Sequence, residues 1–99
     1  MISVVIPCLN EVGYIESTLN SLLRQEDPGE PWEVVVADGG SDDGTRLCLD
    51  RISAENGNIR WVENPLKTTP NALNIGIEAS KGETIIILGA HAEVDEDFL

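Results

Sequence analysis

Residues 34–45 read Val-Val-Val-Ala-Asp-Gly-Gly-Ser-Asp-Asp-Gly-Thr, an apolar run that passes directly into glycines and polar side chains. A continuous β-branched run of this length is typical of a strand covered on both faces, as in a parallel sheet. Residues 2–6 and 85–88 have the same character. Residues 59–62 carry Arg60 in their middle, which predicts a strand nearer to an edge.

Helical patterns separate the four apolar runs. Apolar residues recur with helical spacing between 15 and 23. A second helix is predicted over 41–52, with Ser41 or Asp42 as its N-cap and acidic residues in its first turn.

The third helix has the clearest signals. Thr69 is its predicted N-cap, Pro70 follows in the first turn, and Gly82 is predicted to stop it. Leu73 and Gly76 share its predicted apolar face, and the glycine there indicates a close approach between helix and sheet.

The predicted order is therefore β-α-β-α-β-α-β, an α/β fold with a mostly parallel sheet and helices on both faces. A chain of 99 residues forms one domain or part of one. In such sheets ligands bind beyond the carboxyl ends of the strands, at a switch point. The candidate site is thus formed by the segments that follow the strands, 7–11, 38–45, 64–69 and 89–93, whereas the opposite edge carries only ordinary turns.

Composition excludes several partners. The 18 acidic residues outnumber the 6 basic ones, for a net charge of −12, which disfavours nucleic acid and anionic membrane surfaces. Cys8 and Cys48 are expected to be small buried thiols rather than a disulfide or a nucleophile. No run approaches the roughly twenty apolar residues of a membrane span, and no basic leader precedes the first strand, so we expect a cytoplasmic chain without a signal peptide.

Motifs for nucleotide phosphates are missing from their usual places. Neither a Gly-x-Gly-x-x-Gly turn nor a phosphate-binding loop follows the first strand, and Gly39-Gly40 follow the second strand instead. A bound nucleotide would therefore lack the usual backbone cradle, for which a carboxylate-held metal is the common substitute.

The polar segments resemble family 2 glycosyltransferases of the GT-A fold. Residues 3–11 (Ser-Val-Val-Ile-Pro-Cys-Leu-Asn-Glu) resemble the opening of that family, and residues 34–45 its second-strand motif, in the subgroup that reads Asp-Gly-Gly-Ser. Asn64-Pro65 with residues 72–83 resemble its third-helix block. The resemblance implies the Rossmann-like half of the fold. It also implies an inverting transfer from a nucleotide-diphosphate sugar to a saccharide or lipid-linked acceptor, in polysaccharide or glycolipid synthesis.

The resemblance also implies a set of nucleotide-binding residues, drawn from three loops: Pro7, Asn10, Glu11, Asp38, Gly39, Gly40 and Lys67. In this set Asp38 would contact the base or ribose and Lys67 the diphosphate. The competing interpretation is structural, with 7–11 as a helix entry, Asp38 as a turn-capping acceptor and Lys67 as a solvated side chain.

The fourth loop departs from the family. Family members carry Asp-x-Asp or Asp-Ala-His there, with the first Asp at the donor–metal site, whereas this chain has Gly89-Ala90-His91. Mg²⁺ or Mn²⁺ prefers hard oxygen ligands, and Gly89 offers only a backbone carbonyl. Glu93 and His91 are therefore the metal-ligand candidates, with His91 also a candidate phosphate contact and Asp95, Glu96 and Asp97 nearby. A substituted ligand, metal-independent donor binding, an inactivated enzyme and a merely solvated acidic loop remain open.

The family's acceptor side and catalytic base lie beyond this fourth motif. We therefore expect residues 1–99 to be a truncated, donor nucleotide-binding part with no catalytic residue of its own. Its fourth strand would expose apolar surface and self-associate, and a further part of the protein would provide any membrane association. The main rival is a non-catalytic nucleotide-binding or interaction module on the same fold; a sugar-phosphate nucleotidyltransferase is disfavoured because its Gly-rich, basic first loop is absent.

Overall fold

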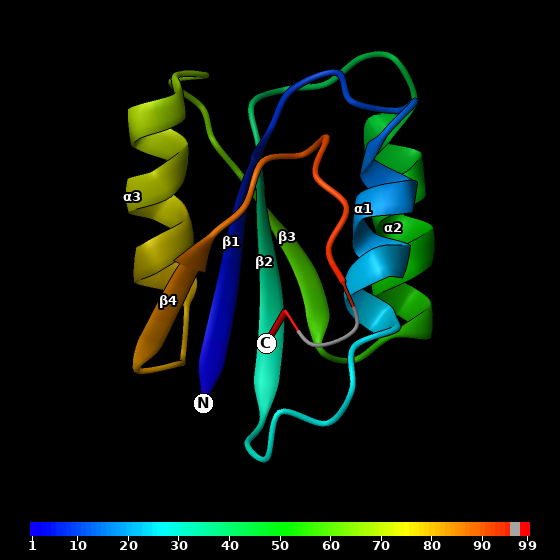
Figure 1. Cartoon of the computed structure of the whole chain (residues 1–99). Coiled ribbons are helices and arrows are strands. Elements are labelled where there is room, and N and C mark those ends of the chain that lie inside the picture. The colour runs from blue at the N-terminus through cyan, green and yellow to red at the C-terminus, as the bar shows by residue number, and fades with distance from the viewer. Residues whose placement is uncertain (96–97) are drawn as a thin grey trace.

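The computed structural model describes residues 1–95 and 98–99, in which strands and helices alternate as the sequence predicts (Figure 1). The elements in chain order are β1 Ile2–Cys8, α1 Ile15–Leu23, β2 Trp32–Asp38, α2 Thr45–Glu55, β3 Ile59–Glu63, α3 Thr69–Ala79 and β4 Thr84–Ile87. The α/β class is confirmed.

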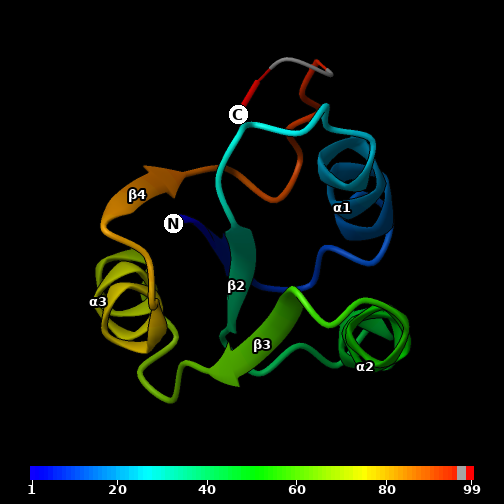
Figure 2. The same cartoon turned by 90° about the horizontal axis from the view of Figure 1, so that it is seen from below.

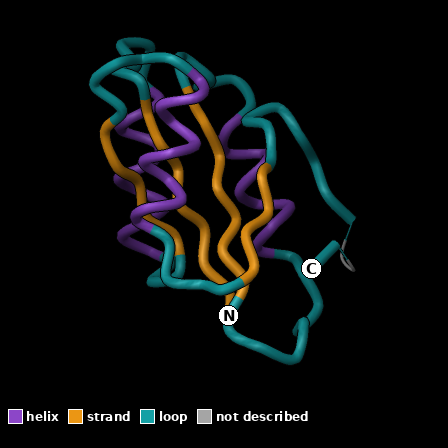
Figure 3. Tube along the Cα trace, turned by 90° about the vertical axis from the view of Figure 1, so that its left-hand side faces the viewer, coloured by secondary structure: helices purple, strands orange, loops and turns teal. Residues whose placement is uncertain are grey.

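All strand pairs are parallel, and the strand order is β3-β2-β1-β4. The chain builds outward from β1 through β2 to β3, and then crosses back to place β4 on the other side of β1. Helices α1 and α2 cover one face of the sheet and α3 covers the other (Figures 2 and 3). The carboxyl ends of all four strands therefore meet at one edge, with the switch in strand order between β1 and β4.

The main hydrophobic core lies under α1 and α2. Val4 and Ile6 of β1 belong to it and have no exposed surface, while the intervening Val5, equally buried, faces α3. This double coverage explains why the central strands are β-branched at successive positions. After β4, residues 88–95 run back along α1, as the orange-to-red trace of Figure 1 shows. The Thr18 hydroxyl on α1 donates to the carbonyl of Ala90 in this segment (2.8 Å).

Helix α3 packs unusually close to the sheet because its buried residues are small. A Cβ at Gly76 would lie 2.4 Å from Cγ1 of Val5, which confirms the predicted close approach. Ala72 and Gly76 form the buried face, whereas Ile77 is 44% exposed. Gly76 of the predicted face is therefore buried as expected, whereas Leu73 is only half-buried.

Both predicted ends of this helix need correction. The N-cap is Thr68, not Thr69, and its hydroxyl accepts the Asn71 N–H. The helix ends at Ala79 with an extended Ser80, before Gly82. Gly82 serves a different purpose, since a Cβ there would lie 2.5 Å from the Ser3 hydroxyl oxygen.

The two edge strands of the sheet are β3 and β4. β3 lies at an edge, as its internal arginine predicts. β4 forms the other edge, and Ile87 is 48% exposed. The described residues therefore do not cover this strand on both faces, and it exposes apolar surface as expected for residues 1–99. The expected self-association through this surface stays a prediction. None of the described helices is long and apolar enough to cross a membrane.

The amino-terminal edge of the sheet is not merely a set of ordinary turns. The buried Glu33 carboxylate accepts hydrogen bonds from the Ser3 hydroxyl (2.7 Å) and the Lys81 backbone N–H (2.6 Å), and it pairs with Arg60 (3.3 Å). Burial alone would raise the pKa of Glu33, but these donors outweigh it and lower the pKa. This cluster joins the first three strands to the turn before β4.

We predict that Gly76→Ala destabilises the chain by about 1–2 kcal/mol. Alanine at an unconstrained helix position would instead gain about 1 kcal/mol, so the sign of the change reports the contact with Val5. Gly57→Ala is the matched control, because nothing lies within 4 Å of its Cβ and its effect should stay within about 0.5 kcal/mol. Urea unfolding measures both, and a stabilised Gly76→Ala would contradict the close packing of α3.

Candidate functional site

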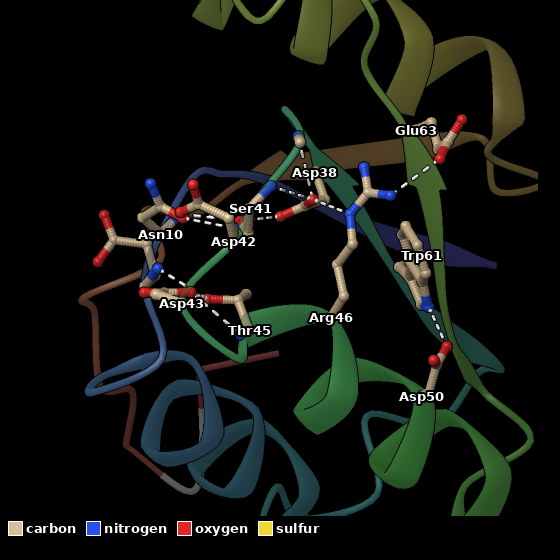
Figure 4. A network of polar contacts seen from close by, with 12 residues as sticks. Asn10, Asp38, Ser41, Asp42, Asp43, Thr45, Arg46, Asp50, Trp61 and Glu63 are labelled. Atoms are coloured by element: carbon tan, nitrogen blue, oxygen red, sulfur yellow. Dashed lines mark hydrogen bonds and ion pairs between the residues drawn. The ribbon is translucent and has the colours of Figure 1, made fainter.

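The loop after β1 is held by side chains from the loop after β2. Three consecutive backbone N–H groups donate across the gap between the loops: Asn10 to Ser41 Oγ (2.8 Å), Glu11 to Thr45 Oγ1 (3.0 Å) and Val12 to Asp43 Oδ2 (3.3 Å). The Asn10 side chain returns the interaction by accepting the Asp42 N–H at 2.9 Å (Figure 4). The two loops thus form a single hydrogen-bonded unit.

These cross-loop bonds explain where α2 begins. The predicted start at 41, with Ser41 or Asp42 as the N-cap, is wrong, because the chain at 41–43 is held against the first loop. The N-cap is Gly44, whose φ of 99° is left-handed, and no acidic residue lies in the first turn of the helix. Asp43 assists from outside the helix by accepting the Thr45 N–H at 3.0 Å.

Asp38 is the buried centre of the second loop and has no exposed surface. Its carboxylate accepts from the backbone N–H groups of Gly40 (3.1 Å) and Ser41 (3.0 Å), from the Ser41 hydroxyl (2.5 Å) and from Arg46 Nε (2.8 Å). Burial alone would raise the pKa of Asp38, but the bonds from Ser41, Arg46 and Gly40 outweigh it and hold the pKa below its ordinary value. The hydrogen bonds of the Asp38 carboxylate are thus made within the protein. The expected contact of Asp38 with the base or ribose of a nucleotide stays a prediction.

Arg46, at the start of α2, was not identified from the sequence. Besides Asp38, its guanidinium contacts Glu63 at the end of β3 (2.9 Å) and lies 5.0 Å from the ring centre of Trp61 (Figure 4). An isolated arginine has no diagnostic spacing, so only the fold brings these partners together.

A pocket of about 190 Å³ opens at the same edge of the sheet. One wall comes from the loop after β1 and the other from the β3–α3 connection, and the lining residues are Pro7, Cys8, Leu9, Glu11, Asn64, Lys67, Thr68, Thr69 and Ala72. The sequence therefore predicted Pro7, Glu11 and Lys67 at positions that line one pocket. Asn10 and Asp38 do not line it, although Asn10 is adjacent in sequence to Glu11, which does.

Gly39 and Gly40 lie against Lys67, which itself has a left-handed φ of 62°. A Cβ on Gly39 would lie 3.4 Å from the Lys67 Cα, and Gly40 has a φ of 96° with the Lys67 side chain beside it. The glycine pair thus lets the β3–α3 connection close over the second loop. This long-range contact has no counterpart in the sequence pattern.

The metal-ligand candidates are only partly brought together. His91 Nε2 contacts the Glu11 carboxylate, and the ring centres of His91 and Tyr14 are 4.4 Å apart. Glu93 instead accepts from Ser17 on α1 (2.5 Å). Among residues 1–95 and 98–99 no group of three or more His, Cys, Asp or Glu side chains can hold a metal ion, so the described residues do not by themselves form a divalent-metal site; Glu96 and Asp97 lie outside them.

Cys8 lines the pocket as a buried free thiol. It is buried, as predicted, and burial together with the charges of Asp38 and Glu11 raises its pKa to about 12. A thiol with so high a pKa is protonated at neutral pH. Cys48 is also free but only half-buried.

The arrangement described above agrees with a known family. The model of glycosyl transferase family 2 matches residues 3–99. The chain belongs to glycosyl transferase family 2. The resemblance carried by the motifs 3–11 and 34–45 is thereby confirmed.

Relatives and solved structures share this part of the chain. A Methanococcus voltae enzyme, dolichyl N-acetyl-alpha-D-glucosaminyl phosphate 3-beta-D-2,3-diacetamido-2,3-dideoxy-beta-D-glucuronosyltransferase, is 35% identical over 99% of this chain and 31% of its own length. The structure of S. aureus TarS 1-349 with UDP superposes with a TM-score of 0.83 at 25% identity, over 97% of this chain and 29% of that one. The mannosyltransferase PcManGT from Pyrobaculum calidifontis, with GDP-Man and Mn²⁺, gives 0.84 at 30% identity, over 93% and 28%.

Two points follow from these matches. The likeness to the solved transferases confirms the GT-A type of fold. The chain spans about a third or less of the length of the proteins it matches.

We predict that Asp38→Asn destabilises the chain by roughly 3 kcal/mol at pH 7, because it removes a buried charge from its donors. Since the folded-state pKa of Asp38 is lowered, this stabilisation is present above the unfolded-state pKa of about 4 and is lost as the pH falls through the folded-state value. The difference between wild type and variant should therefore shrink as the pH falls from the unfolded-state pKa through the lower folded-state pKa.

Asp42→Asn, an exposed position in the same loop, is the control and should change stability by less than about 0.5 kcal/mol. Urea unfolding at several pH values decides the outcome. A destabilisation by Asp38→Asn that is independent of pH would contradict the role of the Asp38 charge.

Proposed function

We propose that this chain binds the nucleoside diphosphate part of a sugar donor and supplies the donor half of a glycosyltransferase. The pocket beside Glu11 and Lys67 supports this most directly, because it lies at the carboxyl edge of a parallel sheet and one of its walls begins at the end of β1, one of the two strands at the switch in strand order. The two solved structures described above contain UDP and GDP-Man, respectively.

The chemistry of the pocket suits a nucleotide. Pro7, Leu9 and Ala72 offer apolar surface to the faces of a base or ribose, and Thr68 and Thr69 add hydroxyl groups. Lys67 is the cation of the lining and would contact a phosphate as a point charge. At about 190 Å³ the pocket is smaller than the roughly 300–1,000 Å³ typical of ligand sites, so a whole nucleotide sugar would extend beyond it.

The transfer step belongs to the proposal for the whole protein. We expect the acceptor to be a saccharide or lipid-linked and the catalytic base to come from outside residues 1–99. The Methanococcus voltae relative supports a lipid-linked acceptor, because its name includes a dolichyl-linked phosphate sugar. The expected cytoplasmic location, with membrane association through a further part of the protein, stays a prediction.

The rival function is a nucleotide-binding module without catalysis. Gly89 favours this rival, because the expected carboxylate is missing and the described residues form no metal cluster. The PcManGT structure contains GDP-Man together with Mn²⁺, which supports metal-assisted donor binding in that protein, whereas this chain has no carboxylate at position 89. Position 89 therefore distinguishes the two functions.

We predict that Gly89→Asp strengthens binding of UDP or GDP at least tenfold in Mg²⁺ or Mn²⁺ and has no such effect in chelator. A divalent ion would offset the repulsion between the diphosphate and Glu11, and it needs a carboxylate directed at it. The substitution is structurally tolerated, since nothing lies within 4 Å of a Cβ at Gly89 and its φ is not left-handed. Calorimetric titration of wild type and variant, with and without metal, measures the effect.

Gly13→Asp is the control. Nothing lies within 4 Å of a Cβ at Gly13, and the substitution adds the same negative charge to the loop after β1. Metal-dependent binding by wild type would show that the existing side chains already suffice. Failure of both proteins to bind either nucleotide would reject the proposed function.

A further inference from the structure

Arg46 makes three interactions that no other described side chain of the site combines. Its Nε donates to Asp38 Oδ2 (2.8 Å), its Nη1 donates to Glu63 Oε1 (2.9 Å), and its guanidinium lies over the Trp61 ring. The side chain is about one-third exposed, whereas the Asp38 side chain is fully buried. Arg46 therefore supplies the positive charge that a buried carboxylate requires.

The first of these bonds leads to one wall of the pocket. Asp38 binds the Ser41 hydroxyl and backbone, and the same hydroxyl oxygen accepts the Asn10 N–H at 2.8 Å. Asn10 directly precedes Glu11, which lines the pocket. A displacement of Asp38 would be transmitted through Ser41 to this wall.

The second bond leads to the opposite wall. Glu63 is the last residue of β3 and precedes Asn64, which lines the pocket together with Lys67. The Asn64 N–H donates to the Asp38 carbonyl at 2.8 Å, and the Lys67 N–H donates to the Asn64 carbonyl at 3.1 Å. Arg46 thus links the supports of both walls, although it does not line the pocket itself.

We infer that Arg46 is a positioning residue that fixes the two walls of the nucleotide pocket relative to each other. The choice of a nucleotide as the ligand rests on the proposed function. The linkage of the two walls through Arg46 does not depend on that function. The planar guanidinium of Arg46 bonds Asp38 and Glu63 at once and also stacks on Trp61. The single ammonium group of a lysine lacks this planar fork, so lysine is a poor substitute.

Three variants test the inference. Arg46→Met keeps an unbranched side chain over Trp61 and removes the charge and both donors, and Arg46→Lys keeps the charge but loses the fork. Arg51→Met is the matched control, because Arg51 lies on the same helix and pairs with Glu16 (2.7 Å) away from the pocket. Calorimetry with UDP and GDP gives the dissociation constants, and amide NMR shifts report the loops, both at temperatures where circular dichroism shows every variant folded.

We expect Arg46→Met to weaken nucleotide binding at least tenfold and to shift the amide resonances of Ser41 and Asn10. Arg46→Lys should recover binding only in part, and Arg51→Met should stay within twofold of wild type with unshifted loop resonances. A variant that only destabilised the fold would move the unfolding midpoint without changing the dissociation constant of the folded protein.

Binding within twofold of wild type by folded Arg46→Met would overturn the inference. If that variant does not fold, full binding by Arg46→Lys would overturn it. If wild type binds neither nucleotide, the proposed function fails. Unshifted amide resonances of Ser41 and Asn10 in either Arg46 variant would separately reject the linkage between the loops.

Discussion

The buried negative charge of Asp38 is the constraint on which the carboxyl edge of this sheet depends. A carboxylate without exposed surface must be met by donors, because water cannot reach it. The backbone of Gly40 and Ser41 supplies part of this demand and Arg46 supplies the charge. The left-handed glycine at 40 and the late start of α2 follow from bringing these donors around a single side chain.

The polar motif at 38–45 therefore has a structural meaning that precedes any ligand. Its Ser41, Asp43 and Thr45 side chains each accept a backbone N–H from the loop after β1, so the motif holds a neighbouring loop in place. The residues that line the pocket come instead from 7–11 and 64–72. In this account a family motif defines a site by supporting the residues that contact the ligand.

Much of the fold could be predicted from the sequence because it depends on local and periodic signals. The buried strands are marked by β-branched runs, and Gly76 on an apolar helix face indicated the approach to Val5. Errors arose where tertiary contacts decide between local alternatives. Either Thr68 or Thr69 can cap α3, and Ser41 resembles a helix cap in sequence but binds Asp38 and Asn10. The site was predictable as an edge with polar loops, whereas Arg46 was not, since its partners are distant in sequence.

The cross-loop hydrogen bonds make the loops after β1 and β2 one preorganised unit before any ligand binds. Native-state hydrogen exchange of the ligand-free chain tests this most directly, at the amides of Asn10, Glu11 and Val12. The cross-loop bonds predict protection of these three amides by at least about 100-fold, and the loss of protection at Asn10 alone in Ser41→Ala. Exchange of all three amides at the rate of an unstructured peptide would contradict the account.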